Sequence, residues 1–152
     1  MTTEIKVLSL FDGISCGRVA LERAGYKVEK YYASEIDKQA IEISEKNYPD
    51  IERLGSVVNW RKWEIDWSGI DLLIGGSPCQ GFSSSGKGLN FEDPRSVLFF
   101  EFAAILKCIQ KVNPAVKFML ENVGMKPEWC EVITEHLEVP AIELNSKYFS
   151  AQ

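Results

Sequence analysis

The chain has 152 residues, of which 45% are hydrophobic and 26% charged, as in one ordinary globular domain. It contains no apolar run of the roughly 18 residues that a membrane span needs, and its first residues do not form a targeting signal, so we expect a cytoplasmic protein. The net charge of -5 argues against binding nucleic acid by charge alone. Four cysteines without a CxxC pair predict reduced thiols and no metal site.

The first half of the chain alternates strand and helix patterns. A β-rich run at residues 5–10 leads into a glycine-containing turn at 11–17, and apolar residues then recur at helical spacing up to Gly25. A strand at 30–34 ends at Glu35, and a helix at 37–47 stops before a proline. A short strand at 53–58 and a Trp-rich stretch follow.

The second half continues this alternation. An apolar strand at 71–74 breaks at Gly75, and residues 80–94 have the composition of a long loop, which in compact domains is usually functional or disordered. The remaining predicted elements are a helix at 95–112, a strand at 116–120, a helix at 127–137 and a strand at 141–149.

This order predicts an α/β fold, with a mostly parallel open sheet, helices on both faces and right-handed crossovers. Ligands of such sheets bind beyond the carboxyl ends of the strands. Four predicted strand ends carry conspicuous polar or glycine-containing segments, namely 12–17, Glu35, 77–80 and 121–122. We therefore expect these four segments to meet at one edge.

The turn after the first strand has the layout of an adenosine site. Gly13 and Gly17 let the backbone approach a ligand, and the acid Glu35, 22 residues after Gly13, could hold ribose hydroxyls. A simple structural turn is an equally open reading. Asp12 would repel a pyrophosphate at the helix terminus, which favours a cofactor without phosphate such as the cationic S-adenosylmethionine.

Cys79 is the candidate nucleophile. It follows a proline at a strand end and precedes a glycine-rich loop, so we expect it to be accessible. The only histidine, His136, is predicted to be a surface or half-buried helix residue, which disfavours a Cys-His hydrolase. Cys16, Cys108 and Cys130 are interpreted as small buried apolar residues.

Several segments together resemble the DNA cytosine-5 methyltransferases. Residues 76–83 (GSPCQGFS) resemble that family's catalytic loop, 121–123 (ENV) its acid motif, 11–13 (FDG) its first cofactor motif and 95–102 (RSVLFFEF) the segment after its mobile loop. Residues 8–14 and 32–35 are most similar to the de novo methyltransferases and their phage relatives. The order and spacing of the motifs agree over nearly the whole chain, and the resemblance implies a Rossmann-like methyltransferase fold.

The resemblance also implies a mechanism and a set of site residues. The Cys79 thiolate would attack C6 of a flipped-out cytosine, Glu121 would hold or protonate N3, and C5 would take the methyl group. Pro78 and Asn122 complete the expected catalytic set. The residues expected to bind S-adenosylmethionine, and its product S-adenosylhomocysteine, are Phe11, Asp12, Gly13, Ile14, Cys16, Gly17, Glu35, Ile36, Ser56, Val57, Gly76 and Leu98. Candidate contacts to double-stranded DNA are Ser83, Lys87 and Arg95.

Two features depart from the family pattern. Ser56 stands where an Asp usually accepts a hydrogen bond from adenine, and it brings no charge. Family members also continue past residue 152 with a target-recognition region and further motifs, so we expect an incomplete catalytic domain and leave open whether it is active alone. A C-terminal half or a second subunit is the expected partner, and a bacterial or phage restriction-modification enzyme is the expected setting. A transfer-RNA cytosine methyltransferase and a non-catalytic binding partner remain as alternatives.

Overall fold

The computed structural model describes residues 4–78 and 98–149, and its five strands form one sheet in the order β3-β2-β1-β4-β5. Every neighbouring pair is parallel. The strands are β1 (Glu4–Leu10), β2 (Lys27–Ser34), β3 (Glu52–Arg53), β4 (Leu72–Gly76) and β5 (Lys117–Glu121). The prediction of an open parallel sheet is confirmed.

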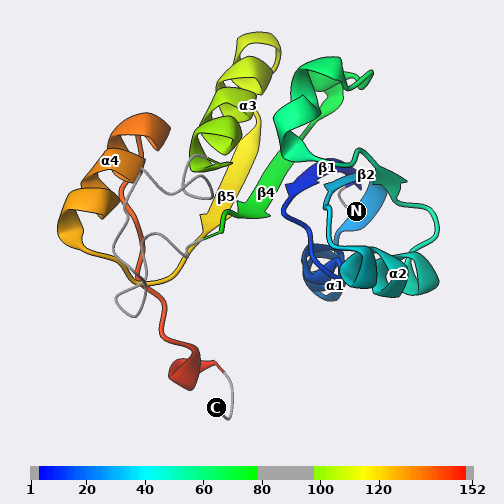
Figure 1. The fold of residues 1–152 in the computed structure, drawn as a ribbon, viewed down its shortest axis with the longest axis horizontal. Coiled ribbons are helices and arrows are strands. Elements are labelled where there is room, and N and C mark those ends of the chain that lie inside the picture. The colour runs from blue at the N-terminus through cyan, green and yellow to red at the C-terminus, as the bar shows by residue number, and fades with distance from the viewer. Residues whose placement is uncertain (1–3, 79–97, 150–152) are drawn as a thin grey trace.

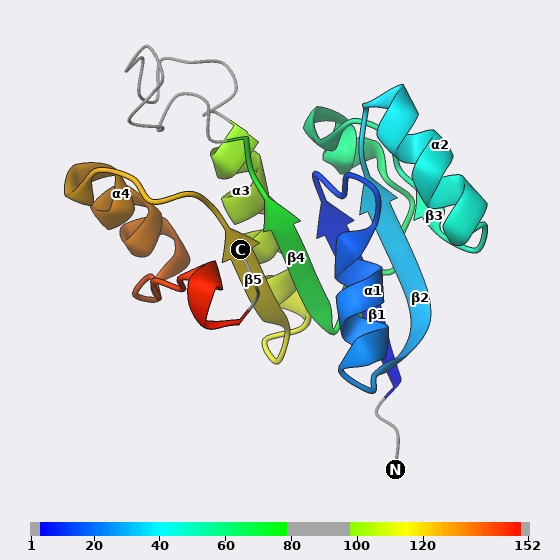
Figure 2. The same cartoon turned by 90° about the horizontal axis from the view of Figure 1, so that it is seen from below.

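Helices cover both faces of the sheet, as Figures 1 and 2 show. On one side lie α1 (Cys16–Arg23) and α2 (Lys38–Asn47), and on the other lie α3 (Leu98–Val112) and a 3-10 helix at Val57–Lys62. The helix α4 (Pro127–Leu137) packs its apolar residues into the same core as α3. Short 3-10 turns at Trp67–Gly69 and Ser146–Tyr148 complete the described elements. Among these residues, no helix is long and apolar enough to cross a membrane.

The alternation of side chains along β1 explains why the molecule has two cores. Ile5 and Val7 pack with Tyr31 on the α1 side, whereas Leu8 and Leu10 pack on the α3 side. Both sets are buried, which is the condition of a central parallel strand covered by helices on each face. The rigid centre of the sheet therefore supports the strand ends where the candidate site lies.

The C-terminal segment departs from the sequence-based prediction. Residues 141–149 form no strand; residues 141–145 and 147–149 are exposed, with Ile142 at 83% and Leu144 at 74%, and the 3-10 turn at 146–148 lies near the end of the segment. A strand needs a hydrogen-bonded neighbour as well as apolar residues, and this segment pairs with no described strand. The predicted third strand at 53–58 is also shorter, since β3 covers only Glu52–Arg53 before the chain turns at Gly55 with a φ of 71°.

Two tryptophans on the α3 side form a matched pair for a stability test. The Trp60 Nε1–H donates to Glu101 Oε2 at 2.6 Å, whereas the buried Trp63 Nε1 has no partner. We expect Trp60→Phe to cost about 1 kcal/mol more of unfolding free energy than Trp63→Phe, because only the first change removes the nearer donor of a half-buried carboxylate. Glu101 Oε2 then keeps only its longer contact with Arg61 Nη1, at 3.3 Å. Urea unfolding of both variants measures the difference. Equal costs would show that the Trp60–Glu101 hydrogen bond contributes no net stability.

Candidate functional site

The register of the sheet brings four strand ends to one edge. Leu10 pairs with Ser34 on one side and with Gly75 on the other, and Gly76 pairs with Glu121. The segments that follow these residues are the turn after β1, Glu35, Ser77 and Asn122. The predicted convergence of these four segments is confirmed for the described residues; residues 79 and 80 of the third segment lie outside them.

The turn between β1 and α1 has an unusual backbone. Phe11, Gly13 and Ser15 all have a positive φ, at 58°, 58° and 67°. This left-handed conformation is natural for glycine but costs a non-glycine residue of the order of 1–2 kcal/mol. Phe11 and Ser15 are therefore strained, and contacts from the rest of the protein must hold them.

The Glu35 carboxylate organises the mouth of this turn. Its Oε2 accepts the Gly13 N–H at 2.7 Å, and its Oε1 accepts the N–H groups of Ile36 and Asp37 at 2.7 and 2.9 Å. One acid thus joins the end of β2, the turn after β1 and the start of α2. Ile36 beside it is 72% exposed and Ile14 is 46% exposed, so apolar surface flanks the carboxylate.

Asp12 points its carboxylate into a polar cluster beneath the turn. Oδ1 accepts from the Tyr31 hydroxyl at 2.8 Å, and Oδ2 accepts from the Ser15 hydroxyl at 2.5 Å. Burial, and secondarily the charge of Asp12, raises the pKa of Tyr31 far above its ordinary value, so this hydroxyl remains a donor at physiological pH.

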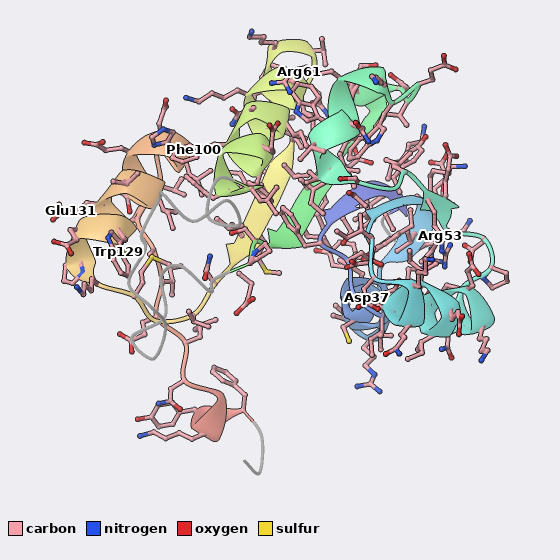
Figure 3. The ribbon with its side chains drawn as sticks, in the orientation of Figure 1. Asp37, Arg53, Arg61, Phe100, Trp129 and Glu131 are labelled. Atoms are coloured by element: carbon pink, nitrogen blue, oxygen red, sulfur yellow. The ribbon has the colours of Figure 1, made fainter. Side chains whose placement is uncertain are left out.

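A small pocket opens between this turn, the end of β2, α2 and β3. Of the residues predicted from the sequence, Asp12, Gly13 and Glu35 line it; the other lining residues are Ala33, Ile41, Ser44 and Arg53. Sequence reasoning missed these four. The one signal was Ser44, a poor helix former in the middle of an apolar-patterned helix, where a serine often serves a hydrogen bond. Figure 3 shows Arg53 and Asp37 on this side of the sheet, whereas Arg61 lies beside α3.

The other predicted cofactor residues do not line the pocket. A Cβ on Gly17 would lie 2.5 Å from Ile74 Cδ1, so this glycine allows α1 to pack closely on the sheet. Ser56 begins the 3-10 helix and makes no side-chain capping bond, while Val57 is buried in the α3-side core. Phe11 and Leu98 also pack against that core.

The cysteines differ from the prediction that they are buried. Cys16 is exposed, so this prediction is wrong for Cys16, whereas Cys108 and Cys130 are half-buried.

The ends of β4 and β5 form the second part of the site. A Cβ on Gly76 would lie 3.0 Å from Glu121 Oε2, so the absence of a side chain at residue 76 makes room for this acid. The Asn122 Nδ2 group donates to the buried Ser77 Oγ at 3.2 Å, just before Pro78. Glu121 itself is exposed. Cys79, Ser83, Lys87 and Arg95 lie outside the described residues.

The single histidine lies on α4, outside the four segments that follow the strand ends. His136 is half-buried on α4, as predicted, and its Nδ1 lies 2.9 Å from the carbonyl oxygen of Val132. Within residues 4–78 and 98–149, no cluster of three or more His, Cys, Asp or Glu side chains could hold a metal ion.

The family model for the C-5 cytosine-specific DNA methylases matches residues 5–128. This segment holds every element of the site described above, and the chain belongs to that family.

Individual relatives agree with this assignment. The chain is 40% identical over 124 residues to the type II methyltransferase M.NgoBV of Neisseria gonorrhoeae, and the alignment covers 79% of the chain and 28% of that protein. It is 40% identical over 125 residues to the orphan methyltransferase M.Rho11sI of Bacillus phage rho11s, covering 80% of the chain and 23% of that protein. The chain therefore spans less than a third of the length of these two relatives.

A solved structure with the same fold is a triple mutant of DNMT2 from Spodoptera frugiperda. It matches with a TM-score of 0.60 at 24% identity, over 88% of this chain and 40% of that chain. The Rossmann-like methyltransferase fold expected from the sequence is confirmed.

Proposed function

We propose that this chain supplies the cofactor-binding and catalytic part of an enzyme that transfers a methyl group from S-adenosylmethionine to C5 of cytosine in double-stranded DNA. The observation that carries the proposal is the meeting of two half-sites at one sheet edge. The pocket bounded by Asp12 and Glu35 lies where β1 and β2 end, and the hydrogen-bonded Ser77–Asn122 pair lies where β4 and β5 end.

The chemistry of the pocket fits the cofactor. The carboxylate of Glu35 is an acceptor for ribose hydroxyls, and exposed Ile36 beside it offers an apolar surface to a purine ring. Gly13 permits close backbone approach, and the charge of Asp12 favours a sulfonium over a phosphate. The cofactor would supply an electrophilic methyl group. In this proposal, Val57 and Ser56 contribute to the adenine side, and Leu98 and Gly76 to the side near the base.

The proposed catalytic steps use Cys79 and Glu121. The Cys79 thiolate forms a bond to C6 of the flipped-out cytosine, and Glu121 shares a proton with N3 as electron density builds on the ring. The nucleophilic C5 then takes the methyl group. Loss of the C5 proton to a base and expulsion of the thiolate from C6 restore the aromatic ring and the free enzyme. Asn122, through Ser77, holds the segment that leads to Pro78 and Cys79.

The target base must leave the duplex stack to reach a nucleophile at a sheet edge. We assign Lys87, Arg95 and Ser83 to contacts with the DNA. The outer edge of β5 has no neighbour among the described strands, and an unpaired strand edge can accept a further strand. We assign that place to a C-terminal half or a second subunit.

Covalent trapping tests the reaction. The chain is incubated with S-adenosylmethionine and duplex DNA carrying 5-fluorocytosine, in which fluorine at C5 blocks the final elimination. We expect a protein–DNA adduct by mass spectrometry that is absent from Cys79→Ser. The same assay on RNA discriminates a transfer-RNA substrate.

The assay is repeated with a C-terminal half of a relative added in trans. An adduct only in its presence would show that flipping needs the further segments. No adduct under either condition would contradict the proposed function and favour a non-catalytic binding role.

A further inference from the structure

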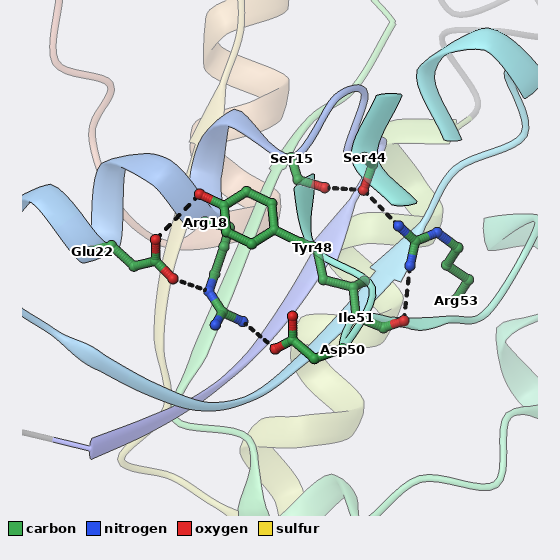
Figure 4. A network of polar contacts seen from close by, with 8 residues as sticks. All are labelled: Ser15, Arg18, Glu22, Ser44, Tyr48, Asp50, Ile51 and Arg53. Carbon is green, nitrogen blue, oxygen red and sulfur yellow. Dashed lines mark hydrogen bonds and ion pairs between the residues drawn. The ribbon is translucent and has the colours of Figure 1, made fainter. Parts of the chain in front are cut away.

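A buried row of polar groups runs from Arg53 to the strained turn (Figure 4). Arg53 Nη2 donates to Ser44 Oγ at 2.8 Å, the Ser44 and Ser15 hydroxyl oxygens lie 2.6 Å apart, and Ser15 Oγ donates to Asp12 Oδ2 at 2.5 Å. Ser15 is fully buried and Ser44 is 2% exposed. The row therefore joins β3, α2 and the turn after β1 through two buried hydroxyl groups.

The direction of these hydrogen bonds follows from the number of protons available. Ser15 has one hydroxyl proton and gives it to the Asp12 carboxylate, so the Ser44 hydroxyl must donate to Ser15. Ser44 in turn accepts from the Arg53 guanidinium, which can only donate. Every bond points from the cation towards the anion, an arrangement in which each bond polarises and strengthens the next.

The guanidinium that begins the row is itself firmly held. Arg53 Nη1 donates to the carbonyl oxygen of Ile51 at 2.8 Å, and Nε lies 3.5 Å from Glu45 Oε1. The side chain is 20% exposed, and Arg53 and Ser44 both line the pocket beside Asp12 and Gly13. At its other end the row reaches two residues of the turn. These are Ser15, whose left-handed backbone is strained, and Asp12, which precedes the left-handed Gly13.

We propose that Arg53, acting through Ser44 and Ser15, is a positioning residue that holds the turn at residues 11–15 in its cofactor-binding conformation. This inference rests on the proposed function, because it assigns the turn to S-adenosylmethionine. Arg53 does not need to touch the cofactor. It offsets the strain at Ser15 and fixes the Asp12 carboxylate before any ligand arrives, so the pocket needs less reorganisation on binding.

A second arginine in the same region provides a matched control. Arg18 pairs with Glu22 at 2.7 Å and with Asp50 at 3.3 Å, and its guanidinium lies 5.3 Å from the ring centroid of Tyr48. Figure 4 shows these contacts beside the Arg53 row but separate from it. Arg18 ties α1 to the segment after α2, and its guanidinium also lies 5.8 Å from the ring centroid of Tyr31, whose hydroxyl donates to Asp12. Replacing Arg18 should therefore lower global stability and reach Asp12 only indirectly, while the Arg53 row stays intact.

The first experiment needs no ligand. Amide hydrogen exchange of Gly13, whose N–H donates to Glu35, is measured by NMR in wild type, Arg53→Met, Ser44→Ala and Arg18→Met, relative to Leu8 in the centre of β1. We expect the Gly13-to-Leu8 ratio of exchange rates to rise at least about tenfold in Arg53→Met and Ser44→Ala and less than about threefold in Arg18→Met. An unchanged ratio in the first two variants, or an equal rise in all three, would overturn the inference.

The second experiment is calorimetric titration of S-adenosylmethionine into the same proteins. We expect Arg53→Met to raise Kd about tenfold, Arg53→Lys to recover part of this loss, and Arg18→Met to stay within about twofold of wild type. If Arg53→Met binds like wild type, the inference fails while the proposed function stands. If wild type itself does not bind, the proposed function fails, and the exchange ratios still decide whether Arg53 holds the turn.

Discussion

Gly75→Ala is expected to lower the free energy of unfolding by about 3 kcal/mol, at the upper end of the cost of overpacking a core. An added Cβ would lie 2.8 Å from the Leu10 carbonyl oxygen and 3.2 Å from Phe102 Cε2. The first contact is with the backbone of the central strand β1, which cannot move without disturbing its pairing with β2 and β4. Urea unfolding monitored by tryptophan fluorescence measures the loss.

Gly124→Ala is the matched control for this substitution. Nothing lies within 4 Å of the Cβ position there, and the backbone is not left-handed. We expect this variant to be neutral or more stable by up to about 1 kcal/mol, because alanine restricts the unfolded chain. If both variants lost the same stability, close packing at Gly75 would not be the cause.

Glu35→Gln is expected to weaken S-adenosylmethionine binding by at least about tenfold, and it tests the carboxylate at the mouth of the pocket. Both oxygens of Glu35 accept backbone N–H groups, so an amide NH2 in place of either oxygen must face a donor. An unmade hydrogen bond of this kind costs about 1–3 kcal/mol. Calorimetric titration with S-adenosylmethionine gives the change in Kd.

Glu42→Gln removes the same charge from an exposed position of α2 and serves as the control. We expect its Kd to stay within about twofold of wild type, since a surface charge of this kind contributes little. Equal weakening in both variants would attribute the effect to net charge rather than to the hydrogen bonds of Glu35.

The sequence predicted the parallel sheet and the meeting of strand ends because both follow from local patterns. Apolar runs such as residues 5–10 and 71–74 and the glycines after them report burial and turns directly. The position of Asp12, Gly13 and Glu35 in the pocket could be predicted because each residue closely follows a strand, and the ends of parallel strands lie at one edge of the sheet. Their catalytic and cofactor roles, and those of Cys79, stay predictions.

The sequence could not reveal the polar row or the fate of residues 141–149. Ser44 meets Arg53 and Ser15 only through the packing of α2 against β3 and the turn after β1. No local pattern encodes such contacts. Residues 141–149 have the composition of a strand, but a strand also depends on a partner at the right edge. The conformational preferences of local sequence therefore determine neither the polar row nor the conformation of residues 141–149.

The spacing of contacts in the two half-sites bears on how the protein folds. In the half that contains the pocket, Asp12 meets Tyr31 and Gly13 meets Glu35 across 19 and 22 residues. In the other half, Ser77 meets Asn122 across 45 residues. Closing the longer loop costs more chain entropy, so early assembly favours the first unit. During synthesis, a nascent chain would therefore form the pocket beside Asp12 before the hydrogen bond between Ser77 and Asn122 closes.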